Sequence, residues 1–282
     1  MNHTRLPELL IAPLVEAALV EDLGPSGDVT SQAVIPPDLH YTARLNARQP
    51  GVISGVQLAE LAFARVDRDL QLDILRGDGG TVAAGETVMT IAGSAASILA
   101  AERVALNFMG RLSGTATLTS AFVAETRGTR ARITCTRKTT PGLRLVEKTA
   151  VRHGGGAAHR YGLSDAILIK DNHIAAAGGI GPVLRRARAE ASHMRRIEIE
   201  VDTLAQLDEV LATGGADVVL LDNMSTEDLR RAVARVDGQL VTEASGNMRL
   251  ERIAEVAATG VDFISVGALT HSAPVLDLGL DF

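Results

Sequence analysis

The sequence predicts an α/β protein in which a separate α+β domain precedes an incomplete parallel α/β barrel. Two observations support this fold class. From about residue 131 onward, short β-branched segments alternate with amphipathic helical segments, which is the pattern of βαβ units around a parallel sheet. The first part of the chain lacks this alternation and combines helices with turn-rich extended segments. At 282 residues, the chain is long enough for both parts.

The elements expected in the first part are two helices and several extended segments. The helices show apolar residues at helical spacing, and the extended segments are bounded by glycine-rich turns. In chain order, we expect a helix at 8–20, extended segments at 41–47 and 51–55, a helix at 58–66 and a turn-rich β segment at 72–93.

A long helical segment follows and joins the two parts. It runs from residue 95 to about 125, and we expect it to be loosened at Gly110 and Gly114. We therefore place the N-terminal domain at residues 1–110 and the barrel domain at 111–270. The C-terminal tail, at about 271–282, is expected to pack back on the first domain.

Six segments of the second part are predicted to be strands. Helical segments separate the last four of them, at 204–212, 226–236 and 250–259. A closed barrel of this type needs eight strands, so six indicate an open barrel unless further strands are hidden in the sequence. The six strands are expected at 132–136, 166–170, 196–201, 217–222, 240–245 and 262–267.

Composition and charge exclude several classes of protein. A net charge of −6 argues against a protein that coats nucleic acid, so any anion must be bound by locally placed cations. No apolar run approaches the roughly 18 residues of a membrane helix. The N-terminal run lacks the basic segment of a signal peptide, and we expect a cytoplasmic protein. The single cysteine, Cys135, excludes an intrachain disulfide framework and is best explained as a buried structural thiol.

Polar residues at the C-terminal ends of the predicted strands indicate one shared pocket. In a parallel α/β barrel these ends meet at the face that carries active sites. Arginine and lysine there suit carboxylates and phosphates, and the small residues after the last strands suit phosphate binding by backbone N–H groups. We therefore expect strongly anionic substrates. In strand order, the residues are Arg137 and Lys138, then Lys170 to His173, Glu200, Asp222 and Asn223, Ser245 and Gly246, and Gly267 to His271, with Arg160 in addition.

Simpler interpretations of these residues remain open at this point. Asp222 could be the N-cap of the following helix, and "HGGGAAHR" (153–160) could be a helix end and a loop. Lys170 must either reach a pocket or pair with a carboxylate. These residues also fit two further functions. One is a phosphosugar aldolase or isomerase with Lys170 as nucleophile, and the other is a non-enzymatic metabolite-binding or transport-associated protein. The crowding of arginines argues against the aldolase, and the complete set of charged positions argues against the binding protein.

Several long motifs carry a resemblance to a known family. They are "EDLGPSGDVTS" (21–31), "AERVALNFMGRLSG" (101–114), "TRKTTPGLR" (136–144), "GGGAAHRYGLSDAILIKDNHI" (154–174), "EIEV" (198–201), "LLDNM" (220–224), "EASGN" (243–247) and "DFISVGALTHSAP" (262–274). With these motifs, nearly the whole chain resembles the quinolinate phosphoribosyltransferases, a family of type II phosphoribosyltransferases. The resemblance implies an N-terminal α/β sandwich plus an open α/β barrel. It also implies a homodimer, or a higher oligomer, whose active site takes residues from both subunits.

The resemblance implies a reaction and a role for each motif residue. Quinolinate and phosphoribosyl pyrophosphate, with Mg²⁺, would give nicotinate mononucleotide, pyrophosphate and CO2 in NAD biosynthesis. Catalytic roles are implied for Lys138, Lys170, Glu200 and Asp222, and the two carboxylates would hold the metal directly or indirectly. The implied quinolinate contacts are Thr136, Arg137, His159, Arg160 and Lys170, with Arg103 from the partner subunit. The implied phosphoribosyl pyrophosphate contacts are Lys138, Glu200, Asp222, Asn223, Ser245, Gly246, Gly267 and His271.

Overall fold

The computed structural model describes residues 5–282, which form two compact units. One unit contains the chain up to Ser120, together with Thr140–Gly155 and Leu269–Phe282. The other contains Ala121–Thr139 and Gly156–Ala268. The first unit extends beyond the division expected at residue 110, because it includes the chain to Ser120 and helix α5 (Arg144–His153). It also includes the C-terminal segment, which was expected to pack on the first domain.

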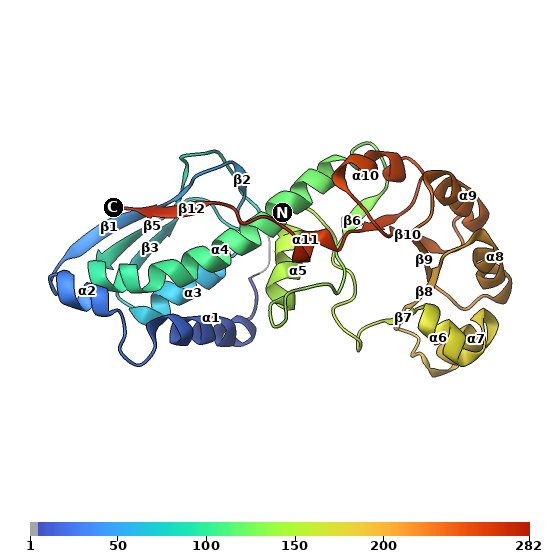
Figure 1. Ribbon diagram of the computed structural model, residues 1–282, viewed down its shortest axis with the longest axis horizontal. Helices are drawn as coiled ribbons and strands as arrows, with labels where there is room; N and C mark the ends of the chain where they lie inside the picture. The colour runs from blue at the N-terminus through green and yellow to red at the C-terminus, as the bar shows by residue number, and fades with distance from the viewer. Residues whose placement is uncertain (1–4) are drawn as a thin grey trace. The chain divides into compact units, whose positions relative to one another are not determined.

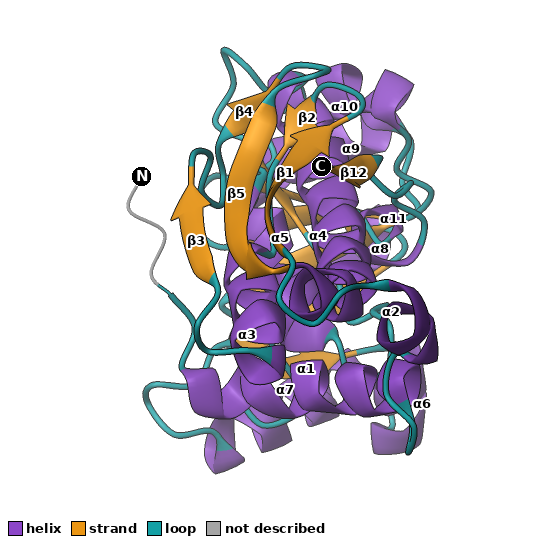
Figure 2. Ribbon diagram, turned by 90° about the vertical axis from the view of Figure 1, so that its left-hand side faces the viewer, coloured by secondary structure: helices purple, strands orange, loops and turns teal. Residues whose placement is uncertain are grey.

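The first unit is an α+β sandwich, which confirms the predicted class of this part of the chain. Its main sheet has four antiparallel strands in the order β12-β1-β5-β3 (Figure 2). Alternate residues of β1 (His40–Ala47) are buried, because every second side chain of a strand points to the same face. The other strands are β2 (Gly51–Val52), β3 (Gln71–Ile74), β4 (Thr81–Val82), β5 (Thr87–Ser94) and β12 (Leu278–Asp281). The helices, besides α5, are α1 (Glu8–Leu23), α2 (Val29–Val34), α3 (Val56–Val66) and most of α4 (Ala95–Ala124).

Helix α4 continues without a break through Gly110 and Gly114, so the prediction of a helix loosened there was wrong. Both glycines serve close packing against the C-terminal segment. A Cβ atom at Gly114 would lie 1.9 Å from the carbonyl oxygen of Pro274. The carbonyl of Gly110 accepts the backbone N–H of Leu276 at 3.0 Å. A glycine costs a helix only about 1 kcal/mol relative to alanine, and the packing that its missing side chain permits outweighs this cost.

The second unit is the open parallel barrel that the sequence predicted. Its six strands have the order β6-β11-β10-β9-β8-β7, and all neighbouring pairs are parallel. Within the described chain, no ladder joins β6 to β7, so the sheet does not close. The strands are β6 (Arg132–Thr134), β7 (Ile167–Ile169), β8 (Ile197–Val201), β9 (Val218–Asp222), β10 (Val241–Ser245) and β11 (Phe263–Ser265).

Helices lie along the outside of the parallel sheet (Figure 1). Helices α8 (Leu204–Thr213), α9 (Thr226–Val236) and α10 (Leu250–Ala257) form close to the predicted ranges. Two further helices, α6 (Asp171–Ala177) and α7 (Ile180–Glu190), lie between β7 and β8, where the sequence predicted none. The short helix α11 (Ala268–His271) follows β11.

Between residues 5 and 282, no helix combines the length and the apolar character that a membrane span requires.

Candidate active site

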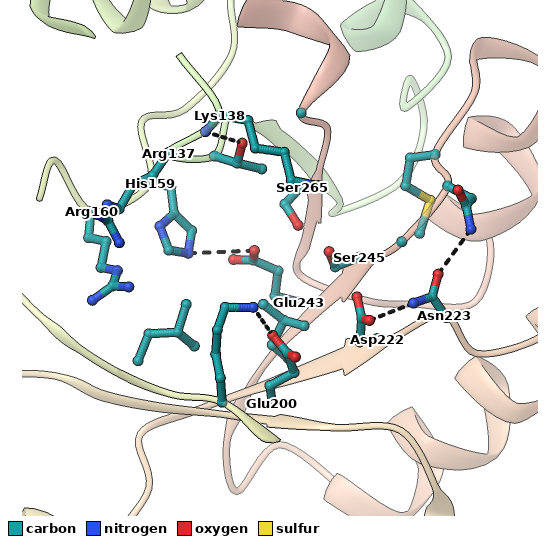
Figure 3. A pocket seen from close by; sticks show the side chains of 18 residues that line it. Arg137, Lys138, His159, Arg160, Glu200, Asp222, Asn223, Glu243, Ser245 and Ser265 are labelled. Atoms are coloured by element: carbon teal, nitrogen blue, oxygen red, sulfur yellow. Dashed lines mark hydrogen bonds and ion pairs between the residues drawn. The ribbon is translucent and has the colours of Figure 1, made fainter. Parts of the chain in front are cut away.

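A cavity of about 550 Å³ lies at the C-terminal ends of the parallel strands, within the second unit (Figure 3). The strands bring residues from distant parts of the chain to this face because all of them run in the same direction. The predicted site residues that line it are Thr136, Arg137, Lys138, His159, Arg160, Lys170, Glu200, Asp222, Asn223, Ser245, Gly246 and Gly267.

Asp171, Asn172 and His173, which were expected in the pocket, begin helix α6 and do not line the cavity. Two residues to which the resemblance gave substrate contacts also do not line it, and both belong to the first unit. Arg103 lies on α4, its side chain is 62% exposed, and it faces the neighbouring Glu102 at 3.5 Å. His271 ends α11, and its Nδ1 lies 2.6 Å from the hydroxyl oxygen of Ser272. The roles expected for Arg103 and His271 remain predictions.

The cavity has a second layer of side chains that the sequence analysis missed. Side chains two residues apart on a strand point to the same face, so each rim residue has a neighbour one layer deeper. On β8 this neighbour of Glu200 is Glu198, and on β10 the neighbour of Ser245 is Glu243. The residue two positions before each strand-end residue identifies Glu198 and Glu243 from the sequence alone. The lining residues that were missed are Leu168, Leu220, Glu243, Ser265, Asn247 and Met248.

Two arginines present buried donors on one side of the cavity. The Nε atoms of Arg137 and Arg160 are both buried and have no hydrogen-bond partner among residues 5–282. The Nη1 of Arg160 donates to the carbonyl of Ala166 at 3.2 Å. Burial and then the nearby Arg137 guanidinium lower the pKa of Arg160, with Glu198 offsetting part of this effect. Two half-buried guanidinium groups that repel each other form a site suited to an anionic ligand.

His159 lies between two buried carboxylates at the bottom of the cavity. Its Nε2 is 3.1 Å from Glu198 Oε2 and 3.6 Å from Glu243 Oε1. Nε2 is therefore placed to donate a hydrogen bond to Glu198 in the tautomer that carries a proton there. Ligand atoms of the three residues lie within 4.8 Å of one another, which is also compatible with a metal site. The shortest of these separations, from His159 to Glu198, is that of a hydrogen bond, and we assign no metal to the group.

Lys170 and Glu200 form an ion pair at the rim. Lys170 follows β7 directly and is the N-cap residue of α6, so its side chain reaches across to β8. The Lys170 side chain is 48% exposed and that of Glu200 is 12% exposed. Each group of the pair offsets the charge of the other. Lys170 therefore meets both expectations for a lysine at a strand end, because it lines the cavity and pairs with a carboxylate.

Asp222 ends β9 and faces the cavity. The N-cap of the next helix is Ser225, whose side chain accepts from the N–H of Asp228, so the N-cap interpretation of Asp222 was wrong. One oxygen of Asp222 accepts a hydrogen bond from the side chain of Asn223 at 2.6 Å. The oxygens of Glu200 and Asp222 are hard ligands of the kind that Mg²⁺ prefers, and their number leaves room for substrate oxygens.

Family models match both parts of the chain. The model for the N-terminal domain of quinolinate phosphoribosyl transferase matches residues 28–113. The model for the C-terminal domain of the same enzyme matches residues 115–281.

Individual relatives are similar over almost their whole length. The nicotinate-nucleotide pyrophosphorylase (carboxylating) of Mycobacterium leprae is 44% identical over 275 residues, which are 95% of this chain and 95% of that protein. A quinolinate phosphoribosyltransferase (decarboxylating) of Nicotiana tabacum is 43% identical over 306 aligned positions, with 99% of this chain and 87% of that protein covered. The solved nicotinate-nucleotide pyrophosphorylase of Francisella tularensis has a TM-score of 0.94 at 40% identity, over 98% of this chain and 97% of that one.

Proposed function

The chain belongs to the quinolinate phosphoribosyltransferase family, and we propose that the cavity at the strand ends is its active site. The protein is a decarboxylating phosphoribosyltransferase. It transfers the phosphoribosyl group of phosphoribosyl pyrophosphate to quinolinate and forms nicotinate mononucleotide, pyrophosphate and CO2 in NAD biosynthesis. The observation that carries the assignment is the division of the cavity, with Arg137, His159 and Arg160 on one side and Asp222 and Ser245 on the other (Figure 3).

We assign quinolinate to the arginine side. Quinolinate carries two carboxylates on adjacent ring carbons, and the buried Nε donors of Arg137 and Arg160 have no partner within the described residues. Forked guanidinium groups bind planar carboxylates through paired hydrogen bonds. A dianion would also relieve the repulsion between the two guanidinium groups that contributes to the lowered pKa of Arg160. His159, Lys170 and the hydroxyl of Thr136 complete this side.

We assign phosphoribosyl pyrophosphate to the opposite side. The carboxylates of Glu200 and Asp222 can accept hydrogen bonds from ribose hydroxyls. The small residues Ser245, Gly246 and Gly267 leave the backbone accessible to phosphate oxygens at the ends of β10 and β11. The exposed Lys138 would supply a positive charge near the pyrophosphate. We further propose that His271 contacts the same substrate.

Mg²⁺ fits this side of the cavity. Glu200 and Asp222 offer an all-oxygen donor set, and the substrate's own phosphates would supply further oxygens. When bound, Mg²⁺ would neutralise part of the charge on the departing pyrophosphate. Removal of divalent ions with a chelator should therefore abolish turnover, and added Mg²⁺ should restore it.

The transfer step breaks the bond between ribose C1′ and the pyrophosphate oxygen, and it forms a bond from C1′ to the quinolinate ring nitrogen. Positive charge develops on the ribose during this exchange, and the carboxylates of Glu200 and Asp222 stabilise it. Lys138 stabilises the negative charge that leaves with the pyrophosphate. The arginine side contributes by holding the ring nitrogen in line with C1′.

The decarboxylation step follows from the first. Once the ring nitrogen carries the ribose, the ring is cationic and can accept an electron pair. The bond from the ring carbon beside this nitrogen to its carboxylate then breaks, CO2 leaves, and the electron pair remains on that carbon until it takes up a proton. This sequence requires no covalent intermediate with Lys170, whose Nζ is paired with Glu200.

A direct assay tests the proposed site and reaction together. The purified protein is mixed with quinolinate, phosphoribosyl pyrophosphate and Mg²⁺, and nicotinate mononucleotide and CO2 are measured. Arg137→Ala should lose activity, whereas Arg186→Ala, which changes an exposed arginine of α7, should retain it. Turnover of nicotinic acid in place of quinolinate would overturn the assignment.

We also propose a cytoplasmic homodimer in which Arg103 of the partner subunit completes the quinolinate side. Supporting this, the Arg103 side chain is 62% exposed, and its one ion-pair partner within residues 5–282 is the neighbouring Glu102. Mixing Arg103→Ala chains with Arg137→Ala chains creates heterodimers in which one site is intact. Activity should return in proven heterodimers, and its failure to return would refute the shared site.

A further inference from the structure

Two asparagines at the rim of the cavity have an uncommon backbone conformation. Asn223 has a φ of 53° and Asn247 a φ of 48°, both in the left-handed region. Among residues 5–282, Asp237 is the only other non-glycine residue with a positive φ. Such conformations cost about 1 kcal/mol or more and tend to persist at functional sites, where the surroundings hold them in place.

The side chains of these asparagines form a chain of hydrogen bonds that ends at Asp222. Asn247 Nδ2 donates to Asn223 Oδ1 at 3.2 Å, and Asn223 Nδ2 donates to Asp222 Oδ2 at 2.6 Å. The backbone N–H of Asn223 donates to the carbonyl of Ser245 at 3.0 Å. The amide of Asn223 is therefore held at both of its polar atoms, and its orientation follows from its partners.

Gly246 provides the space in which the Asn223 amide lies. Its φ of 92° is in the left-handed region, and a Cβ atom there would lie 2.1 Å from Asn223 Oδ1 and 2.8 Å from Asn223 N. No other residue type would leave the amide in this position. We call Asn223, Gly246 and Asn247 the amide clasp.

We propose that Asn223 is a positioning residue that acts through Asp222, and that Gly246 and Asn247 hold it in place. The clasp engages one oxygen of Asp222 with a neutral donor and directs the other oxygen, Oδ1, to the ligand. Asp222 then makes a single directed contact instead of turning both oxygens toward the ribose. The inference rests on the proposed function, because it takes the ligand of Asp222 to be phosphoribosyl pyrophosphate. It replaces the direct substrate contact expected for Asn223 with an indirect role.

The amide clasp predicts a specific kinetic effect. Asn223→Ala should lower kcat/KM for phosphoribosyl pyrophosphate about tenfold, which is typical of losing a group that orients a ligand-binding side chain. Quinolinate affinity should not change, because the clasp contacts none of the arginine side. Asn247→Ala should have a smaller effect in the same direction, since it removes one support of the Asn223 amide. Gln239→Ala is a matched control, because this exposed amide lies before the start of β10 and far along the strand from the clasp.

A double-mutant cycle distinguishes positioning from direct contact. If Asn223 acts only through Asp222, Asn223→Ala should have no further effect in an Asp222→Ala background. If it contacts the substrate itself, the two losses should add, and the proposal falls. The dissociation constant for phosphoribosyl pyrophosphate, measured by calorimetry, gives the same comparison without turnover. An unchanged kcat/KM for Asn223→Ala in the wild-type background would also overturn the proposal.

The cycle also separates this inference from the proposed function. The wild-type assay with quinolinate decides the reaction, and the cycle decides the role of Asn223. Thermal melting of each variant reports whether it is folded. If Asn223→Ala does not fold, the same cycle with Asn247→Ala decides the question, because Asn247 acts on Asp222 only through the Asn223 amide.

Discussion

Glu198 and Glu200 lie on the same face of β8, two residues apart, yet they have different surroundings. Glu200 belongs to the cavity rim and pairs with Lys170, whose side chain is 48% exposed. Glu198 belongs to the cavity floor, which we define as His159, Glu198 and Glu243, and it bonds to a His159 side chain that is only 11% exposed. Rim charges can exchange their partners for a ligand, whereas floor charges depend on one another. Substitutions at the rim should therefore affect turnover with little change in stability. Those at the floor should lower stability, and at His159, which also lines the quinolinate side, they should lower turnover as well.

The largest effect is expected at the rim, from Glu200→Gln. The amide cannot stabilise the positive charge that develops on the ribose, so turnover should fall by about 10²–10³-fold. Quinolinate affinity and the melting temperature should remain close to wild type. Steady-state kinetics, calorimetry and thermal melting measure these quantities, with the exposed Glu209→Gln on α8 as the control. A turnover within a few fold of wild type would remove Glu200 from the catalytic residues.

The next effect is expected at the floor, from His159→Ala. This change leaves Glu198 and Glu243 buried and facing each other without the donor between them. Losing one partner from a buried charged group typically lowers the free energy of unfolding by about 3 kcal/mol. Denaturant unfolding should show the loss, and the exposed His193→Ala should not. If stability were unchanged while turnover alone fell, the distinction between rim and floor would be wrong.

A smaller effect is expected for Arg137→Ala, on one substrate only. The lost guanidinium forms charge-assisted hydrogen bonds to a quinolinate carboxylate, so the dissociation constant for quinolinate should rise about 10–100-fold. Affinity for phosphoribosyl pyrophosphate should stay within roughly threefold, because that substrate lies on the other side of the cavity. Calorimetry with each ligand, with Arg186→Ala as the control, makes the comparison. Equal weakening of both ligands would contradict the division of the cavity.

The smallest effect is expected in the loop between Arg160 and β7, and it depends on pH. Burial alone would raise the pKa of Asp165, but the backbone N–H groups of Gly162 and Tyr161 outweigh it and hold that pKa below its ordinary value. The ionised carboxylate therefore contributes stability above its unfolded pKa of about 3.9, and this contribution is lost as the pH falls through the folded pKa. Asp165→Asn should lower the melting temperature by about 2 °C near neutral pH, and the difference should shrink toward pH 3. A constant difference across this range would exclude ionisation as the cause.

The rim was predictable from the sequence because strand ends are local features. The apolar runs stop at Lys170, Glu200 and Asp222, and the alternation of strands and helices places these ends on one face. The two carboxylates of the floor were missed because Glu198 and Glu243 lie inside strands, where a carboxylate needs a partner that local patterns do not reveal. That partner, His159, is 39 residues from Glu198. The continuity of α4 was misjudged for the same reason, since the segment that packs on Gly114 lies far along the chain.

The sequence by itself determined the open parallel barrel, the preceding α+β domain, the family and most of the residues that line the cavity. These follow from periodicity, strand-end positions and long motifs, which are properties of neighbouring residues. Only the tertiary structure decided which groups are partners: Lys170 with Glu200, His159 with the floor carboxylates, and Asn223 with Asp222 and Asn247. Most of these pairs join different strand ends. Their distances depend on how the strands are arranged side by side, which no local pattern along the chain specifies.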